Sequence, residues 1–157
     1  MKTKFFALFL AVALLSGCYG YMHFYPAQGP LAAQTPLPVF KAKFSDFSGG
    51  AITMPFVDGE VCRGNWTRVQ PTTSANGAQT VSAAGKPDMA AVWDAVYGPG
   101  FYTAHVLGSY YYGTAVLKGD RGSSVDLEFV REDRGEEHHD VRGVARDNKG
   151  NVYKVVF

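Results

Sequence analysis

Three short loops that end in glycine constrain the fold of this chain more than any other feature of its sequence. They are Val57-Asp58-Gly59, Asp120-Arg121-Gly122 and Asn148-Lys149-Gly150, and each lies between two segments that read as β-strands. A three-residue hairpin loop combines a type I turn with a left-handed residue, and glycine adopts that conformation at the lowest cost. The loops therefore predict three β-hairpins.

Loop length also predicts which side chains share a face, because it sets the register of the paired strands. Small residues then oppose large ones: Gly113 lies opposite Phe129, and Gly143 lies opposite Val155. Such pairs fill an interior face without voids. In the first hairpin, one face carries Ile52, Met54, Phe56, Cys62, Gly64 and Trp66. We expect a mainly β fold of about six or seven antiparallel strands, arranged as a small sheet or barrel.

The opposite faces of these hairpins carry charge. The outward positions are occupied by Lys118, Asp126, Glu128, Arg142, Arg146 and Lys154. An acidic strand between basic strands suits cross-strand ion pairs on a solvated surface. We therefore predict that this whole face is wet.

One short helix is expected near residues 88–97. Met89, Val92, Trp93 and Val96 are spaced at i, i+3, i+4 and i+7, which places them on one helical face. This apolar stripe predicts a helix that packs on the core and covers an edge or an end of the β structure.

The N-terminus has the pattern of a secretory signal peptide. Lys2 and Lys4 precede an unbroken apolar run at residues 5–15. A run of this length is too short to cross a bilayer as a helix, which needs roughly 17–25 residues. Removal of the two lysines leaves 13 of the 15 Lys and Arg residues against 14 Asp and Glu, a net charge of about −1. This balance does not predict a basic nucleic-acid-binding face, so we expect no nucleic-acid partner.

The residues Leu15-Ser16-Gly17-Cys18 resemble the lipobox of bacterial lipoproteins. The resemblance implies that residues 1–17 are removed and that Cys18 carries diacylglycerol and a fatty acid. Membrane lipid would then be a partner through the acylated Cys18, and the protein would be lipid-anchored in the cell envelope. Tyr19 follows the cysteine where an inner-membrane retention signal has aspartate, which implies the outer membrane. Residues 88–117 and 143–157 also look like small uncharacterised lipoproteins of Gram-negative bacteria, and that likeness implies no activity.

Composition divides the remaining chain. Residues 18–36 contain the candidate acylated cysteine and a proline-rich stretch, which predicts an extended tether. Residues 37–157 are expected to form a single β-rich domain. Within it, residues 70–86 are rich in Thr, Ser, Ala and Gly, which predicts a long exposed loop.

The candidate catalytic and metal-binding residues are few. Cys62 falls among apolar residues and no sequence argument places a histidine beside it, so we predict a buried, unreactive thiol. Asp58 and Glu60 flank a turn whose backbone requirements explain the aspartate. His138 and His139 lie in an acidic segment and are weak metal candidates, because adjacent residues of an extended chain point to opposite faces. We therefore expect no catalytic residue, no metal and no cofactor.

These observations favour a non-enzymatic lipoprotein of the envelope that acts as an interaction or structural module, with an envelope protein as a further partner. Two alternatives stay open. One is a β domain that binds a small apolar ligand or lipid, with aromatic residues at Tyr97, Phe101, Tyr102 and Tyr110–Tyr112 as a pocket lining. The other is an envelope hydrolase that uses Cys62 or the acidic segment.

Overall fold

The computed structural model describes residues 19–45, 49–56, 58–69, 71–73, 79–81, 88–107, 109, 111–133 and 139–157. Its larger sheet contains β1 (Tyr19–Gln28), β2 (Phe40–Ser45), β3 (Ala51–Pro55), β4 (Val61–Val69), β7 (Tyr111–Gly119), β8 (Ser124–Asp133), β9 (His139–Asp147) and β10 (Val152–Val156). The remaining elements are the 3-10 turn η1 (Pro30–Ala33), β5 (Pro71–Thr73), β6 (Gln79–Val81), the helix α2 (Met89–Tyr97) and the π-helical turn η2 (Tyr102–Val106).

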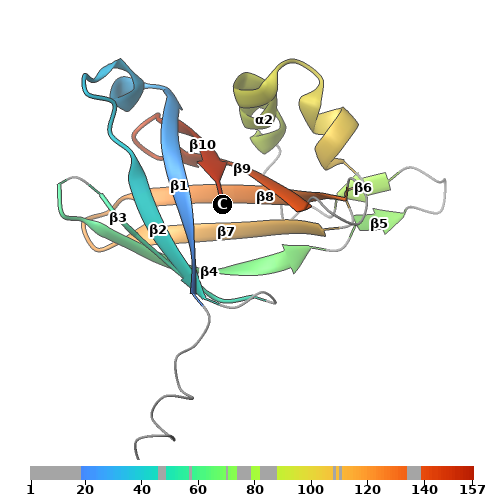
Figure 1. Ribbon diagram of the computed structural model, residues 1–157, viewed down its shortest axis with the longest axis horizontal. Coiled ribbons are helices and arrows are strands. Elements are labelled where there is room, and N and C mark those ends of the chain that lie inside the picture. Colours follow the sequence, from blue (N-terminus) through green and yellow to red (C-terminus); the bar gives the residue numbers. More distant parts are fainter. Residues whose placement is uncertain are drawn as a thin grey trace, which may run out of the picture.

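The larger sheet is a closed antiparallel barrel in the order β1-β10-β9-β8-β7-β4-β3-β2 (Figure 1). The predicted mainly β fold with one short helix is therefore confirmed. Of the two predicted forms, sheet or barrel, the barrel is the observed one. It has eight strands, one or two more than expected.

The three predicted hairpins are present with the predicted register. Phe56 pairs with Glu60 through hydrogen bonds, and Gly119 pairs with Ser123 in the second hairpin. Asp147 pairs with Asn151 in the third. Each loop therefore has three residues, and its last residue is a glycine with φ between 80° and 95°. All three loops lie at the same end of the barrel, together with η1 (left in Figure 1). We call this the hairpin end.

The predicted tether is wrong for its described part, because residues 19–28 are the first strand of the barrel. β1 pairs with β2 on one side and with β10 on the other, and this second pairing closes the barrel. Met22 and Phe24 point into the core, where both are buried. Tyr19, Tyr21 and Tyr25 point outward and are exposed. Because tyrosine is itself a large aromatic residue, the sequence does not show the alternation of buried and exposed positions. The barrel therefore includes residues 19–28, which precede the predicted boundary at residue 37, and Cys18 lies outside the described residues.

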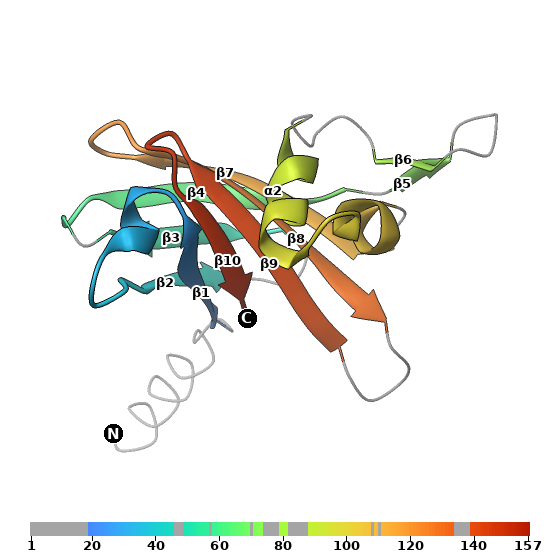
Figure 2. The ribbon, with the colours of Figure 1, turned by 90° about the horizontal axis from the view of Figure 1, so that it is seen from above.

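The predicted loop at residues 70–86 contains some regular structure. β5 and β6 pair antiparallel within it, from Pro71 opposite Val81 to Thr73 opposite Gln79. The small sheet that they form projects from the end of the molecule opposite the hairpin end (Figure 2). The rest of the predicted loop lies outside the described residues.

The barrel interior is packed with side chains, as the register predicts. Gly113 opposes Phe129 and Gly143 opposes Val155. A Cβ atom on Gly113 would overlap the Phe129 ring, and one on Gly20 would overlap the ring of Phe44. Each glycine therefore makes room for an aromatic ring inside the barrel.

The helix α2 forms with its predicted apolar stripe, but it packs on the outer wall of the barrel and not on an edge or an end. It lies across β9 and β10 (Figure 2) and buries Met89, Val92 and Trp93. These residues form a second core with Val130 and Val144, which point outward from β8 and β9. The predicted wet face is therefore partly wrong.

Glu128 shows the cause of that error. The helix covers this outward-pointing carboxylate, which is 2% exposed, and the Trp93 indole N–H donates a hydrogen bond to it at 3.0 Å. Beyond the helix the prediction of cross-strand ion pairing is confirmed, since Arg146 pairs with Asp126 at 3.3 Å. Arg146 also contacts Asp88 at the start of α2.

Candidate functional site

At the hairpin end, buried polar groups bind one another. Glu60 is 1% exposed and accepts backbone N–H bonds from Arg121 at 3.0 Å and Ser123 at 2.9 Å. The Ser123 hydroxyl also donates to Glu60, and Lys149 Nζ lies 3.4 Å from it. These donors, led by Ser123, lower the pKa of Glu60 to about 2. One carboxylate thus joins all three hairpins.

A second carboxylate, Asp147, completes this network. It accepts backbone N–H bonds from Lys149 and Asn151, both at 2.9 Å, and bonds from the Asn151 side chain at 2.8 Å and the Tyr153 hydroxyl at 2.7 Å. Asn151 in turn accepts the backbone N–H of Leu31 in η1 at 2.9 Å. Burial is the main cause that raises the pKa of Tyr153. The hairpin end is therefore bound together internally.

Cys62 lies inside the barrel near this network. Its side chain is fully buried, as predicted. Burial, and next the negative charge of Glu60, raise the pKa of the thiol to about 11. A nucleophilic cysteine needs the opposite shift, toward the thiolate at neutral pH.

The metal candidates receive no support. His138 lies outside the described residues, and His139 begins β9, where only its backbone position is described. Across the residues that the structure describes, no three His, Cys, Asp or Glu side chains are grouped so that they could hold a metal ion. Within the same residues, no helix is both long and apolar enough to cross a membrane.

At the opposite end of the barrel, β10 pairs with its two neighbours over only part of their length. β10 pairs with β1 only as far as His23 and with β9 only as far as Arg142. Tyr19–Met22 of β1 and His139–Val141 of β9 extend beyond these positions and have no pairing to β10 among the described residues.

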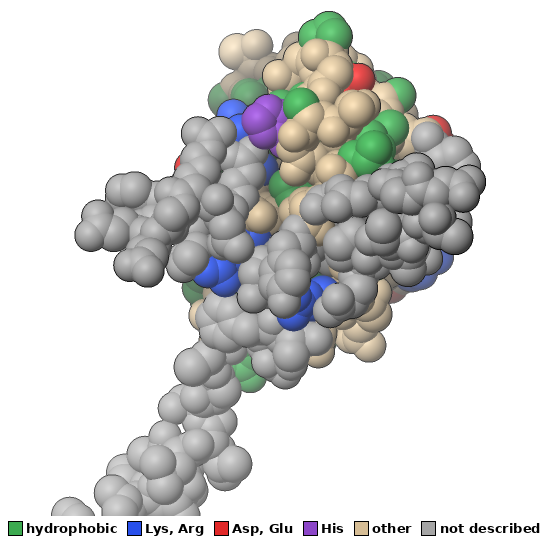
Figure 3. Space-filling view, turned by 90° about the vertical axis from the view of Figure 1, so that its right-hand side faces the viewer, with side chains coloured by type: hydrophobic (Ala, Val, Ile, Leu, Met, Phe, Trp, Pro, Cys, Tyr) green, Lys and Arg blue, Asp and Glu red, His purple; other side chains and the backbone are tan. Residues whose placement is uncertain are grey.

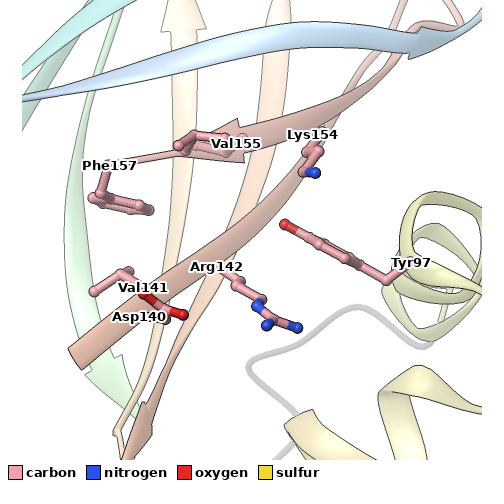
Figure 4. Close-up of a pocket in the computed structure, with 8 residues that line it drawn as sticks. Tyr97, Asp140, Val141, Arg142, Lys154, Val155 and Phe157 are labelled. Atoms are coloured by element: carbon pink, nitrogen blue, oxygen red, sulfur yellow. The ribbon is translucent and has the colours of Figure 1, made fainter. Parts of the chain in front are cut away.

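A groove of about 530 Å³ lies at this end of the barrel. Its lining comes from Tyr97 on α2, Asp140–Arg142 on β9, and Lys154–Phe157 at the end of β10. Figure 4 shows Tyr97 reaching from the helix toward the strands, with Arg142 and Lys154 on either side of its ring. Phe157 lies on the far side of the groove, near Asp140 and Val141. We call this site the wall groove.

The side of the wall groove next to α2 combines aromatic rings with positive charge. Tyr97 stacks on Phe101 with ring centroids 4.6 Å apart, and its hydroxyl donates to the carbonyl of Gly143 at 3.3 Å. The Arg142 guanidinium lies 5.9 Å from the Tyr97 ring centroid, and Lys154 Nζ lies 5.5 Å from it. Cations at these distances from a ring are attracted to its face. This side therefore suits an anionic group.

The other side of the groove leads to aromatic rings in the barrel interior. The ring of Phe157 lies 5.7 Å from that of Phe44 and 5.2 Å from that of Phe129. Trp66 packs edge-on against Phe129 at 5.3 Å. The Trp66 indole nitrogen is buried and has no hydrogen-bond acceptor among the described residues, whereas buried donors are usually paired.

The sequence identified part of this site. Of the aromatic residues proposed as a pocket lining, Tyr97 lines the groove, Phe101 stacks behind it and Tyr102 is half-buried under the helix. Tyr110 lies outside the described residues, and Tyr111 and Tyr112 are described only as members of β7.

Sequence reasoning missed Arg142, Lys154 and Phe157 as members of a site. The hairpin register placed the first two correctly on the outer face, but no local signal showed that Tyr97 of α2 would lie beside them. Comparison with protein-family models, curated proteins and solved structures finds no match to this chain.

Proposed function

We propose that this protein is a lipid-anchored, non-enzymatic β-barrel that binds a small amphiphilic molecule in the wall groove. The ligand class is a molecule with an apolar chain and an anionic head. The observation that carries the proposal is the wall groove itself, with cations on one side and interior aromatic rings on the other. The head would lie between Arg142 and Lys154, and the apolar part would contact Phe157.

The position of the candidate anchor supports this reading. Tyr19 begins β1 at the end of the barrel that carries the wall groove, and Cys18 directly precedes it. If Cys18 is acylated, the groove faces the lipid surface from which an amphiphile would come. A ligand site favours this function over a purely structural module. An envelope hydrolase is the weaker proposal, since the buried Cys62 thiol has a pKa of about 11.

The test uses residues 18–157 with Cys18→Ser, which include every described strand and helix. Dodecanoate and dodecanol, which differ in the charge of the head, are titrated below their aggregation limits by calorimetry. Saturable binding with a preference for dodecanoate is the expected result. Arg142→Gln combined with Lys154→Gln should weaken dodecanoate binding about tenfold or more. This is the effect expected when at least one charge-assisted hydrogen bond to the head is lost. Dodecanol binding should change little.

Lys118→Gln is the matched control, since it removes a positive charge from an outward position on β7, away from the groove. It should leave both affinities unchanged. Two results would contradict the proposal. One is the absence of saturable binding for either probe. The other is an equal effect of the groove variant and the control.

A further inference from the structure

One side of the barrel has an unusual charge distribution. The neighbouring strands β10, β1, β2, β3 and β4 contain no Asp or Glu residue. Their positive residues are Lys41, Lys43, Arg63, Arg68 and Lys154. The acidic residues of the barrel strands lie on β8 and β9. This side, which we call the basic wall, is therefore positive although the whole chain is nearly neutral.

The basic wall and its borders also expose large apolar side chains. Among the described residues, eight large hydrophobic side chains are exposed, and seven of them lie on β1, just before β2, or at the end of β10. Those seven are Tyr19, Tyr21, Tyr25, Leu37, Val39, Val156 and Phe157. Clustering of exposed apolar groups on one side marks an interaction surface.

Tyrosine and lysine are combined on β1 and β2 in a specific way. Lys43 Nζ lies 3.5 Å from the centroid of the Tyr19 ring, and Lys41 Nζ lies 3.9 Å from that of Tyr21. The cross-strand partner of Lys43 is Tyr21, and that of Lys41 is His23. Both lysines therefore reach past their partners toward the start of β1, next to Cys18.

We propose that the basic wall lies against anionic lipid headgroups. Tyrosine rings favour the boundary between lipid and water, and lysines near an anionic bilayer gain attraction from it. An acidic protein would also complement the positive charge of the basic wall, but only a headgroup layer also accounts for the exposed tyrosine rings. The orientation rests on the proposed anchor at Cys18, whereas the binding itself can be measured without it. In Figure 3, which views the end opposite the hairpin end, Lys and Arg side chains (blue) are visible near the middle of the view and on both sides, and Asp and Glu (red) are visible only near its margins.

The test measures the fraction of protein that sediments together with vesicles. The protein is residues 18–157 with Cys18→Ser, and two kinds of vesicle are compared. One contains phosphatidylcholine with about 30% phosphatidylglycerol, and the other contains phosphatidylcholine alone. We expect binding to the anionic vesicles only, with an affinity that falls as salt is raised. Lys41→Gln with Lys43→Gln should weaken binding about 25-fold, roughly fivefold for each lysine.

The matched control is Lys118→Gln with Arg121→Gln, which removes two charges from exposed positions at the β7–β8 hairpin. It should change binding less than twofold. A third variant, Tyr19→Ser with Tyr21→Ser, should weaken vesicle binding but leave its salt dependence in place. The proposal is overturned if anionic vesicles do not bind, or if the control weakens binding as much as the Lys41 and Lys43 changes.

If the tyrosine variant has no effect and soluble polyglutamate competes fully with vesicles, the wall binds acidic polymers and not a headgroup layer. Failure here would leave the wall groove untouched, because Lys41 and Lys43 do not line it. Arg142→Gln alone, which leaves every residue of the basic wall in place, should weaken dodecanoate binding and leave vesicle binding intact.

Discussion

Replacement of Trp93 by phenylalanine should show how α2 is held on the barrel. The indole N–H of Trp93 donates to the buried Glu128 carboxylate at 3.0 Å, and phenylalanine removes that donor. A hydrogen bond to a charged group contributes about 1.5–3 kcal/mol, and the smaller ring adds about 1 kcal/mol for lost packing. Trp93→Phe should therefore lower the free energy of unfolding by about 3 kcal/mol. In a domain of this size, the melting temperature should fall by about 10 °C.

The second tryptophan provides a matched control. Trp66 is also buried, but its indole nitrogen meets no acceptor in the part of the chain that the structure describes. Trp66→Phe therefore loses ring volume without losing a hydrogen bond and should cost about 1 kcal/mol. Urea unfolding at pH 7, followed by far-ultraviolet circular dichroism, measures both variants without relying on tryptophan fluorescence. Trp93→Phe should lower the midpoint and leave the slope unchanged.

A double-mutant cycle separates the hydrogen bond from packing. Glu128→Met removes the acceptor, so Trp93→Phe in that background should cost only the packing contribution of about 1 kcal/mol. The difference between the two backgrounds should be about 2 kcal/mol. The reasoning is refuted if Trp93→Phe costs the same with Glu128 present and absent, or if the two tryptophan variants are equally destabilised.

Four further predictions follow from other parts of the molecule. Hydrogen bonds hold the pKa of Glu60 at about 2, below its ordinary value of 4.5. The ionised carboxylate therefore stabilises the fold fully above pH 4.5, and this stabilisation is lost as the pH falls toward 2. Glu60→Gln should flatten that part of a plot of melting temperature against pH. The Cys62 thiol should react with a thiol reagent in the native protein at least 100-fold more slowly than in urea, in line with burial and a pKa of about 11; equal rates would exclude a protected site. Gly113→Ala should cost about 1–3 kcal/mol, because its Cβ would overlap the Phe129 ring; Phe129→Ala in the same chain should remove most of that additional cost. Cys18→Ser should block processing and palmitate labelling in cells; a normally cleaved variant would contradict the proposed anchor.

The parts of the fold that could be predicted from sequence are those set by nearby residues. The hairpin loops ending at Gly59, Gly122 and Gly150 fix register through turns of three residues, and all three registers are observed. The stripe of α2 is likewise a local pattern. β1 was not predicted because large aromatic residues occupy both of its faces. Tyr19 and Tyr21 point outward, whereas Met22 and Phe24 point into the core, so the sequence shows no alternation of polar and apolar residues.

The parts that could not be predicted depend on residues far apart in the chain. Glu60 looks like a turn residue until Arg121, Ser123 and Lys149, 61 to 89 positions away, bring their donors to it. Glu128 looks like a surface charge until Trp93, 35 positions earlier, covers it. The wall groove is harder still to predict, because α2, β9 and the end of β10 form it together.

The position of β1 changes what an anchor at Cys18 would do. A flexible tether over residues 18–36 would let the domain move some 55 Å from the membrane, and no particular face would meet lipid. A strand that starts at Tyr19 leaves a single peptide unit between the anchor and the barrel, about 3.8 Å from one Cα to the next. The wall groove and the start of the basic wall lie at that same end, within reach of headgroups. Acylation would therefore orient the domain as well as retain it, which is why the groove and the basic wall are best tested without the acyl chains.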